Sequence, residues 1–393
     1  MKKFNQTINL NGITWGHSRG YVPMVATAQR FSEINPEITI NWSIRSLQKF
    51  ADQSIEELAN KFDLLVIDHP SIGEAAKNKI FIPLDNYLSK DFLKNQKLNS
   101  VGLSYESYNF NRHQWALAID AAAPVAAYRA ELFAKLNLQL PETWDELLDL
   151  AKSGKVCFAG LQLDCLMHFY SFCINEGQIP FTQDSKKGIV DMEVAVRALS
   201  AIRELFDLCG EDSIKLNPIR AYELLATSQK YIYCPLGYGY TNYSRRGYVK
   251  NELTFTAPPK RNKKILSTTL GGAGLAISNR LVNDQTKIKT AIEYVKYVAS
   301  AETQNGLFFS VGGQPGHRKA WKNEQNNLIC NNFFKNTLKV LDKAFVRPRH
   351  ANGIHFQNLA SEVMKNFLLK KINAKTTVNE LNKLNNELFI NEQ

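Results

Sequence analysis

The stretch FDLLVID, residues 62–68, is a continuous apolar run of strand length that ends on an aspartate. Strands of parallel sheets show this pattern, because helices cover both faces of such sheets and leave no side for water. The run therefore predicts a central strand of an α/β fold, and the segments around it test that prediction.

The preceding segments alternate between strand and helix patterns. Residues 8–15 (INLNGITW) and 38–44 (ITINWSI) are predicted strands. Residues 23–35 (PMVATAQRFSEIN) are a predicted helix because their apolar residues recur near the period of 3.6. A second helix is predicted over residues 47–61. Strand–helix–strand repetition predicts a parallel sheet with right-handed crossovers.

Shorter strands and more helices follow. Thr143 and Glu146, in PETWDELLDLAK, have the spacing of a capping box at the start of a helix. Further strands are predicted within residues 113–120, 124–129, 230–243 and 270–278, and helices within residues 150–230, 288–299 and 353–389.

Length and composition indicate a globular protein of two lobes, with 393 residues, 44% of them hydrophobic and 22% charged. No apolar run has the roughly 18 residues of a membrane span, so none is expected. Lys2 and Lys3 precede no apolar segment of a secretory signal, which predicts a cytoplasmic protein. A truncated start would instead allow a periplasmic or cell-surface location.

The net charge of +11 is spread along the chain, with a short cluster at residues 260–264 (KRNKK). A solvated basic surface is the first interpretation, and attraction for anionic ligands is the alternative. No recognised motif, and no basic stripe interleaved with aromatic residues, indicates nucleic-acid binding, so no nucleic-acid partner is expected.

The six cysteines form no CxxC pair and have no histidines at zinc spacing. Their apolar or helical surroundings predict reduced thiols in the core. No cofactor and no metal are expected.

Five phrases follow one another in a fixed order along the chain. They are RFSEINPEITINW (30–42), FDLLVID (62–68), QWALAIDAAAPVAAYRAELFAKLNLQLPETWDELLDLAK (114–152), GGAGLAIS (271–278) and AIEYVKYVASAETQ (291–304). Together they resemble the family 1 extracellular solute-binding proteins, the sugar-type receptors of ABC importers.

The resemblance implies an α/β protein with the type II periplasmic-binding-protein fold, in which two lobes enclose a ligand cleft and close by a hinge. Lobe one would comprise residues 1–118 and 262–318, and lobe two residues 119–261 and 319–393. A small-molecule ligand is the expected partner, together with an ABC permease if the chain is exported. The protein is expected to be a monomer.

The first strand ends in ITWGHSRGY, residues 13–21, where the cleft of such a fold would lie. Trp15, His17, Ser18 and Arg19 are therefore candidate ligand-binding residues. The amides of a helix from about Val22 would favour an anion, and Arg19 would hold a carboxylate or phosphate by two contacts. The alternative is a surface Arg–Asp pair beside a capped loop.

Asp68 and His69 follow the strand FDLLVID and should reach the same sheet edge as His17. A carboxylate beside imidazoles suits acid–base chemistry or ligand binding. The alternative is that Asp68 caps the following helix. A zinc ion held by His17, Asp68 and His69 is not expected.

Further candidate ligand-binding residues lie at other predicted strand ends and glycine turns: Arg45, Asp120, Tyr238, Tyr240, Gly271, Gly272, Gly313 and Gln314. Asp120 is a candidate for the cleft or the hinge, and the tyrosines offer flat faces with hydroxyl groups. Packing of loop aromatics is the alternative for the tyrosines.

The function predicted is binding of a small polar or anionic molecule in the interlobe cleft, as a solute-binding protein of the ABC-transporter type. The first alternative is a cytoplasmic enzyme of the lyase or dehydratase kind, on the same fold. In that enzyme His17 or His69 would be the base, Asp68 would orient it and Arg19 would clamp a carboxylate. The second is a cytosolic metabolite sensor.

Overall fold

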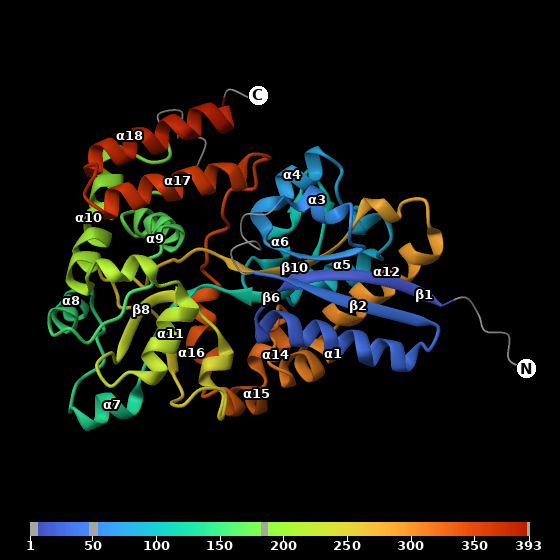
Figure 1. Cartoon of the computed structure of the whole chain (residues 1–393), viewed down its shortest axis with the longest axis horizontal. Helices are drawn as coiled ribbons and strands as arrows, with labels where there is room; N and C mark the ends of the chain where they lie inside the picture. The colour runs from blue at the N-terminus through green and yellow to red at the C-terminus, as the bar shows by residue number, and fades with distance from the viewer. Residues whose placement is uncertain (1–6, 47–53, 182–187, 391–393) are drawn as a thin grey trace, which may run out of the picture. The chain divides into compact units, whose positions relative to one another are not determined.

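The computed structural model describes residues 7–46, 54–181 and 188–390 (Figure 1). The chain divides into two compact units, each built from separate stretches of sequence. Unit 1 comprises Met1–Ala121, Gly271–Asn326 and Arg349–Ile354, and unit 2 comprises Ala122–Leu270, Asn327–Pro348 and His355–Gln393.

Unit 1 is built on a five-stranded sheet of order β2-β1-β3-β10-β6. The strands are β1 (Ile8–Trp15), β2 (Ile38–Arg45), β3 (Leu64–Ile67), β6 (Leu117–Ala122) and β10 (Gly271–Ile277). Strand β1 pairs in parallel with β2 and with β3, which confirms the predicted parallel pairing of the first three strands. Strand β10 is antiparallel to β3, so the complete sheet is mixed.

Helices cover both faces of this sheet (Figure 1). Leu64 and Val66 of β3 pack in a core with α1 (Ser18–Ile34) and α12 (Gln285–Ala299). Leu65 and Ile67 pack in a second core with α3 (Ile55–Ala59) and α4 (Ile72–Lys77). Successive side chains of a strand point to opposite faces, so both faces of β3 must be apolar. This explains the uninterrupted run in FDLLVID.

Helix α1 begins at Ser18, earlier than the predicted start near Val22. His17 is its N-cap, with extended backbone angles, and its side chain accepts a hydrogen bond from the amide of Arg19. His17 was predicted only as a ligand-binding residue. Because it also caps α1, the helix begins closer to the end of β1 than the sequence predicted. Pro23 lies inside the helix.

Trp42 lies in the core of unit 1. Its indole Nε1 donates to the Tyr294 hydroxyl of α12 at 3.2 Å. A Cβ at Gly12 would lie 2.7 Å from the Trp42 ring, so glycine is the residue that lets the indole pack flat on β1. The ring contributes to packing between strand and helix.

The remaining elements of unit 1 are short. They are η1 (His69–Ser71), η2 (Leu84–Asn86), α5 (Lys90–Leu98), α6 (Ser104–Ser107), β4 (Asn109–Phe110), β5 (His113–Gln114), η6 (Asn279–Leu281), α13 (Ala301–Thr303), the π-helix η7 (Gln304–Phe308), α14 (Arg318–Lys322) and α15 (Glu324–Ile329), whose last residues belong to unit 2. The predicted strand over residues 113–120 is thus divided into β5 and β6.

Unit 2 combines a small antiparallel sheet with many helices. The sheet has the order β8-β7-β9, with β7 (Pro124–Tyr128), β8 (Tyr233–Tyr238) and β9 (Thr254–Thr256). The helices are α7 (Ala130–Lys135), α8 (Trp144–Lys152), α9 (Gln162–Asn175), α10 (Met192–Cys209), η4 (Glu211–Lys215), α11 (Pro218–Thr227), η5 (Thr241–Ser244), α16 (Phe333–Leu341), α17 (Gly353–Leu368, in unit 2 from His355), α18 (Ala374–Asn385) and the π-helix η8 (Asn386–Ile390).

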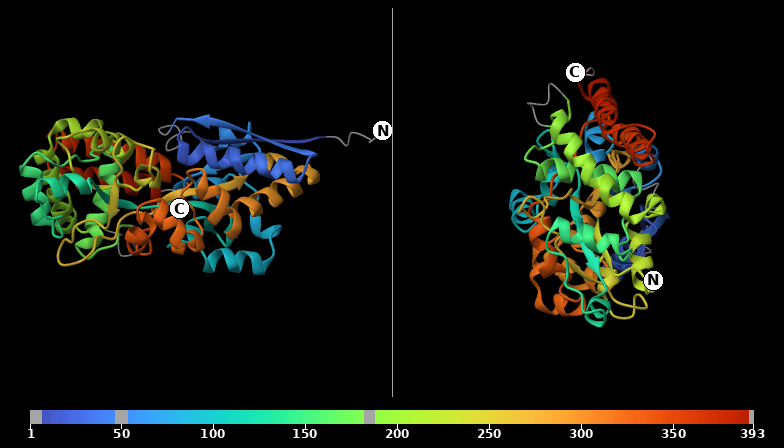
Figure 2. Two further views of the ribbon diagram at one scale, coloured as in Figure 1. Left: turned by 90° about the horizontal axis from the view of Figure 1, so that it is seen from below. Right: turned by 90° about the vertical axis from the view of Figure 1, so that its left-hand side faces the viewer.

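The core of unit 2 lies among α8, α9, α10, α17 and α18, which Figure 2 shows from two sides. Helix α10 packs against α8, α9 and α18. The predicted helices over residues 150–230 and 353–389 are confirmed, and the apolar residues of α9, α10, α17 and α18 meet in this one core.

The described residues contain no helix with both the length and the apolar character of a membrane span. Five of the six cysteines are buried, and Cys209 is half-buried. The predicted core position is therefore confirmed for five residues, and Cys209 lies nearer the surface; the reduced state of the thiols stays a prediction.

The predicted capping box at the start of α8 is confirmed. Thr143 Oγ1 accepts from the amide of Glu146 at 3.3 Å, and Glu146 Oε2 accepts from the amide of Thr143 at 3.0 Å. The two side chains thus satisfy two amides that the first helical turn leaves without intrahelical partners.

Replacing Thr143 by alanine should lower the free energy of unfolding by about 1 kcal/mol, because the Glu146 amide loses its acceptor. Thr143→Ser keeps the hydroxyl and should stay close to the wild type. Urea unfolding followed by circular dichroism measures both. Equal loss in the two variants would show that the box does not stabilise α8.

Candidate functional site

The candidate site in unit 1 is one edge of the sheet, which we call the carboxyl edge. Strands β1 and β2 end together, since Trp15 pairs with Arg45 in the parallel register. Strand β3 ends beside them at Ile67, and the antiparallel β10 begins at this edge with Gly271. The loops that follow β1, β2 and β3 therefore lie together at this edge, beside the start of β10.

Arg19 and Asp120 form a buried two-point ion pair at the carboxyl edge. Arg19 Nε donates to Asp120 Oδ2 at 2.8 Å, and Nη2 donates to Oδ1 at 2.5 Å. The two residues are 3% and 1% exposed. Arg19 comes from the first turn of α1 and Asp120 from β6, so the pair ties this helix to the far strand of the sheet.

The charges around Asp120 have opposing effects. Burial raises the pKa of Asp120, and the negative charge of Asp68 acts in the same direction, while the Arg19 guanidinium opposes both. Asp68 is therefore near enough to the ion pair to affect the pKa of Asp120. Because Asp120 occupies both arms of the guanidinium fork, the pair presents little net charge to a ligand.

His17 is held as a neutral imidazole. Its Nδ1 accepts from the amide of Arg19 at 3.0 Å. Burial, followed by the Arg19 charge, lowers the pKa of His17 to about 4. In a neutral ring whose Nδ1 accepts, the proton resides on Nε2, so His17 is a hydrogen-bond donor at neutral pH.

Asp68 caps the helical turn that follows β3, which is the alternative that the sequence analysis left open. Its Oδ1 accepts from the His69 amide at 2.8 Å and lies 3.2 Å from His69 Nδ1. The His69 side chain is buried and packs edge-to-face on Tyr108, whereas the Asp68 side chain is 19% exposed. Asp68 is therefore the member of this pair that reaches the surface.

Arg45 and Trp15 end neighbouring strands but turn into the protein. Arg45 is buried, and its Nη2 donates to the carbonyl of Val66 at 3.1 Å. Trp15 is buried, and a Cβ at Gly20 would lie 2.3 Å from its ring. Both side chains therefore pack beneath the surface at the carboxyl edge. Ser18 is half-buried at the start of α1.

The glycine turns lie beside Asp120. Gly272 has a φ of +109°, and a Cβ there would lie 2.3 Å from the carbonyl oxygen of Asp120, so only glycine lets β10 begin here. Gln314 is fully buried and donates to the carbonyl of Ala121 at 2.7 Å. A Cβ at Gly313 would lie 2.4 Å from Phe308. These residues position the strand that carries Asp120.

The predicted tyrosines belong to unit 2. Tyr238, half-buried at the end of β8, forms a hydrogen bond through its hydroxyl with Thr269 Oγ1 at 2.8 Å. Tyr240 is buried and packs edge-on against Tyr243. Aromatic packing, the alternative for this loop, thus accounts for Tyr240, and ligand contact by either tyrosine stays a prediction.

Three side chains of interest were missed at the sequence level. Tyr108 supports His69 and donates from its hydroxyl to the carbonyl of Ile67 at 3.2 Å. Thr269 holds Tyr238. Asp164 is buried in the first turn of α9, and burial raises its pKa to about 8. Neither spacing nor residue type signals the roles of Tyr108 and Thr269, because their partners lie far away in the sequence. The burial of Asp164 depends on the packing around α9.

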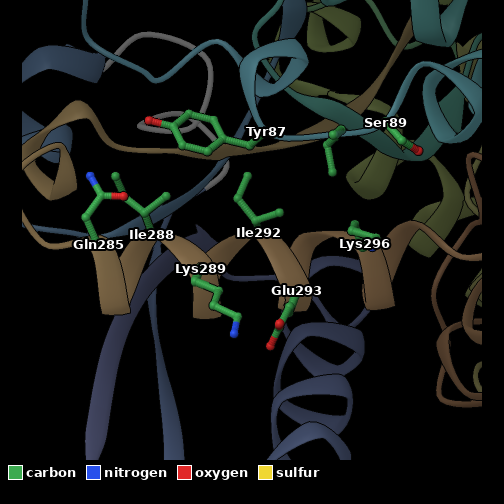
Figure 3. Close-up of a pocket in the computed structure, with 9 residues that line it drawn as sticks. Tyr87, Ser89, Gln285, Ile288, Lys289, Ile292, Glu293 and Lys296 are labelled. Carbon is green, nitrogen blue, oxygen red and sulfur yellow. The ribbon is translucent and has the colours of Figure 1, made fainter.

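A hollow of about 370 Å³ in unit 1 lies away from the carboxyl edge, between α12 and residues 87–89 (Figure 3). Ile288 and Ile292 point from the helix toward Tyr87, while Lys289 and Glu293 point away from it. None of the predicted site residues lines it. Its lining mixes apolar and polar side chains, and Lys289 and Glu293 point away from Tyr87, so we assign no site there.

The described residues (7–46, 54–181 and 188–390) provide no set of ligands for a metal ion. No group of three or more histidine, cysteine, aspartate or glutamate side chains there could hold a metal ion.

Comparison with family models gives one match. Residues 16–206 match the family model of the bacterial extracellular solute-binding proteins, which confirms the resemblance seen in the sequence. No curated protein matches the chain in sequence.

Solved structures share the fold over nearly the whole chain. Maltose-bound MalE3 of T. maritima is 17% identical with a TM-score of 0.81, over 96% of this chain and 98% of that one. A ribitol complex of a solute-binding protein from Agrobacterium radiobacter K84 is 17% identical with a TM-score of 0.82, over 97% and 99%. The GacH receptor of Streptomyces glaucescens GLA.O is 15% identical with a TM-score of 0.78, over 98% and 99%. The predicted periplasmic-binding-protein fold is confirmed.

Asp120→Asn should lower the free energy of unfolding by about 3–5 kcal/mol, because it leaves the Arg19 charge buried without a counter-charge. The matched control is Asp149→Asn, which removes an exposed pair with Lys152 and should cost less than about 1 kcal/mol. Urea unfolding measures both. Similar losses in the two variants would contradict the importance of the buried pair.

The neutral His17 predicts a pH dependence. The unfolded chain binds a proton at His17 below pH 6.5, whereas the folded chain binds it only below about 4. Stability should therefore fall as the pH drops from 6.5 to about 4, by up to roughly 3 kcal/mol from this group. His17→Asn keeps a capping acceptor and removes the titration, so its unfolding free energy should fall less over this range. Parallel profiles of the two proteins would contradict the burial of a neutral imidazole.

Proposed function

We propose that this chain binds a neutral polyhydroxylated solute, a sugar or a polyol. Its residues 16–206 match the family model of the bacterial extracellular solute-binding proteins. The sequence left polar and anionic ligands open. The carboxyl edge of unit 1 is the part of the binding site that we assign to named residues.

The observation that carries this proposal is the charge compensation inside the edge. Arg19, the guanidinium that would attract an anion, already gives two hydrogen bonds to Asp120. An anionic ligand would have to compete with that buried carboxylate and would also meet the partly exposed Asp68. A neutral ligand neither competes with Asp120 for the Arg19 guanidinium nor is repelled by the Asp68 carboxylate.

His17 and Asp68 offer complementary hydrogen bonds to such a ligand. The neutral His17 ring presents Nε2–H as a donor, and the Asp68 carboxylate accepts. A sugar hydroxyl donates and accepts at once, so a row of hydroxyl groups can satisfy both. In this proposal Arg19 and Asp120 are positioning residues, since they hold the His17 loop and do not touch the ligand.

The comparison structures support the ligand class. Relatives of the same fold were solved with maltose, with ribitol and with D-mannitol. They are 15–17% identical to this chain, so the ligand class passes to it as a proposal. Their chemistry matches the neutral hydrogen-bonding groups of the carboxyl edge.

A partner and a location follow from the same premise. We propose an ABC permease as the partner and a place of action outside the cytoplasm, which the family description favours over the cytoplasmic expectation. The predicted lobe boundaries, the interlobe cleft, its closure and the monomeric state stay predictions.

The lyase alternative receives less support. It needs Arg19 as a carboxylate clamp, yet Arg19 is held by Asp120. It also needs a competent base, and a His17 pKa of about 4 makes this imidazole a weak base at neutral pH. No described contact favours the sensor alternative over the receptor.

Asp68→Asn tests the proposal without removing the helix cap, because asparagine also caps helical turns. Loss of the charged acceptor should weaken solute binding by about tenfold or more. Calorimetric titration with maltose, ribitol, D-mannitol and D-tagatose gives the dissociation constants. Asp284→Asn is the matched control, since Asp284 also caps a helix of unit 1, and it should leave binding unchanged.

Two outcomes would contradict the proposal. One is binding of carboxylates or phosphates that Asp68→Asn strengthens, with no response to the four neutral solutes. The other is solute binding that Asp68→Asn and Asp284→Asn affect equally, which would remove Asp68 from the site.

A further inference from the structure

Two buried cysteines of unit 2 lie side by side although they are far apart in the sequence. Val156 and Tyr233 are paired as a parallel bridge, and the amide of Cys157 donates to the carbonyl of Tyr233 at 2.9 Å. The residues that follow this bridge on the two segments are Cys157 and Cys234. Paired residues of neighbouring extended segments direct their side chains to the same side of the sheet.

The two thiols lie close together. The Cys234 thiol is near enough to Cys157 to raise the pKa of the Cys157 thiol. Cys157 Sγ also lies 3.7 Å from the carbonyl of Ala221, and Cys234 Sγ lies 3.9 Å from the carbonyl of Leu236. Both thiols also lie near Tyr222 of α11, since each adds to the effect of burial in raising the pKa of that tyrosine.

This arrangement suits a disulfide. Neighbouring extended segments lie about 4.7–4.9 Å apart, within the range of roughly 4.4–6.8 Å that a disulfide allows between Cα atoms. The spacing of the two segments is therefore compatible with a disulfide between Cys157 and Cys234. The segments themselves already hold their spacing through backbone hydrogen bonds.

We propose that Cys157 and Cys234 form a disulfide when the chain folds in an oxidising environment. The inference is independent of the ligand. It agrees with a family described as extracellular, because disulfides form and persist in oxidising compartments. In a reducing environment the same two residues remain a buried pair of thiols.

The chemistry is thiol–disulfide exchange with a small disulfide such as oxidised glutathione. The thiolate of one cysteine attacks the reagent, the S–S bond of the reagent breaks, and one reduced thiol leaves. The second thiolate then attacks the mixed disulfide and releases the second reduced thiol. The protein loses two hydrogen atoms as two protons and two electrons, and the reagent gains them.

Burial sets the timing of this step. Cys157 and Cys234 are 2% and 0% exposed, and the neighbouring Cys234 thiol together with burial raises the pKa of Cys157 well above its usual range. A folded chain therefore reacts slowly, because thiolates are the reactive form and the reagent cannot reach them. The bond should form mainly during folding, while the two segments are still accessible.

The bond would act close to a predicted ligand contact. Cys234 and Tyr238 lie on the same strand, β8, and Tyr238 ends it. A crosslink from β8 to the Cys157 segment would fix the strand that carries this tyrosine.

The test compares two preparations of the full chain. One is refolded from denaturant in a mixture of reduced and oxidised glutathione, and the other is incubated folded with oxidised glutathione. Both are treated with N-ethylmaleimide in denaturant and digested without reduction. We expect a peptide pair linking Cys157 to Cys234 in the refolded sample, at much lower yield in the folded one.

Variants and stability complete the test. Cys165→Ser, a buried thiol of the same unit, should still form the link, and Cys157→Ser should not. The oxidised protein should melt roughly 5 °C or more above the reduced one. If the variants fail to fold, the melting difference of the wild type decides.

Three results would overturn the proposal. The first is alkylation of all six cysteines in both preparations. The second is a link from Cys234 to Cys209, the half-buried thiol near this pair, in place of Cys157. The third is an oxidised protein that melts at or below the temperature of the reduced one.

Discussion

The two-point contact between Arg19 and Asp120 is the interaction on which the carboxyl edge depends. It joins the first turn of α1 to β6, and both side chains are almost fully buried. His17, two positions before Arg19, is kept neutral by burial and by the Arg19 charge. Gly272 must be glycine because β10 begins against the Asp120 backbone. The pair therefore determines the position, the charge and the protonation of the groups that face a ligand.

Local patterns predicted most of the fold, because they report on single elements. FDLLVID is apolar throughout since both faces of β3 are covered, and the Thr143–Glu146 box marks the start of α8. The start of α1 was missed because a capping histidine is rarer than a capping serine or aspartate. The antiparallel direction of β10 depends on a long connection through unit 2, which no local pattern reports.

The candidate site was predictable only in part. Strand ends identified His17, Arg19, Asp68 and Asp120, since carboxyl ends of parallel strands meet at one edge. What each residue does there depends on partners that are distant in the sequence: Arg19 and Asp120 are 101 positions apart. That pairing narrows the proposed ligand from a polar or anionic molecule to a neutral one. The proximity of Cys157 and Cys234 was missed for the same reason.

The central claim is that the compensated charges of the carboxyl edge select neutral over anionic solutes. Calorimetric titration with matched pairs, ribitol against ribonate and D-mannitol against D-mannonate, tests it most directly. Each pair differs by one carboxylate on the same carbon chain. The account predicts that a polyol binds and that its acid binds at least about tenfold more weakly, because Asp68 repels it and Asp120 holds Arg19. Binding of the acids alone, or tighter binding of the acids, would contradict it.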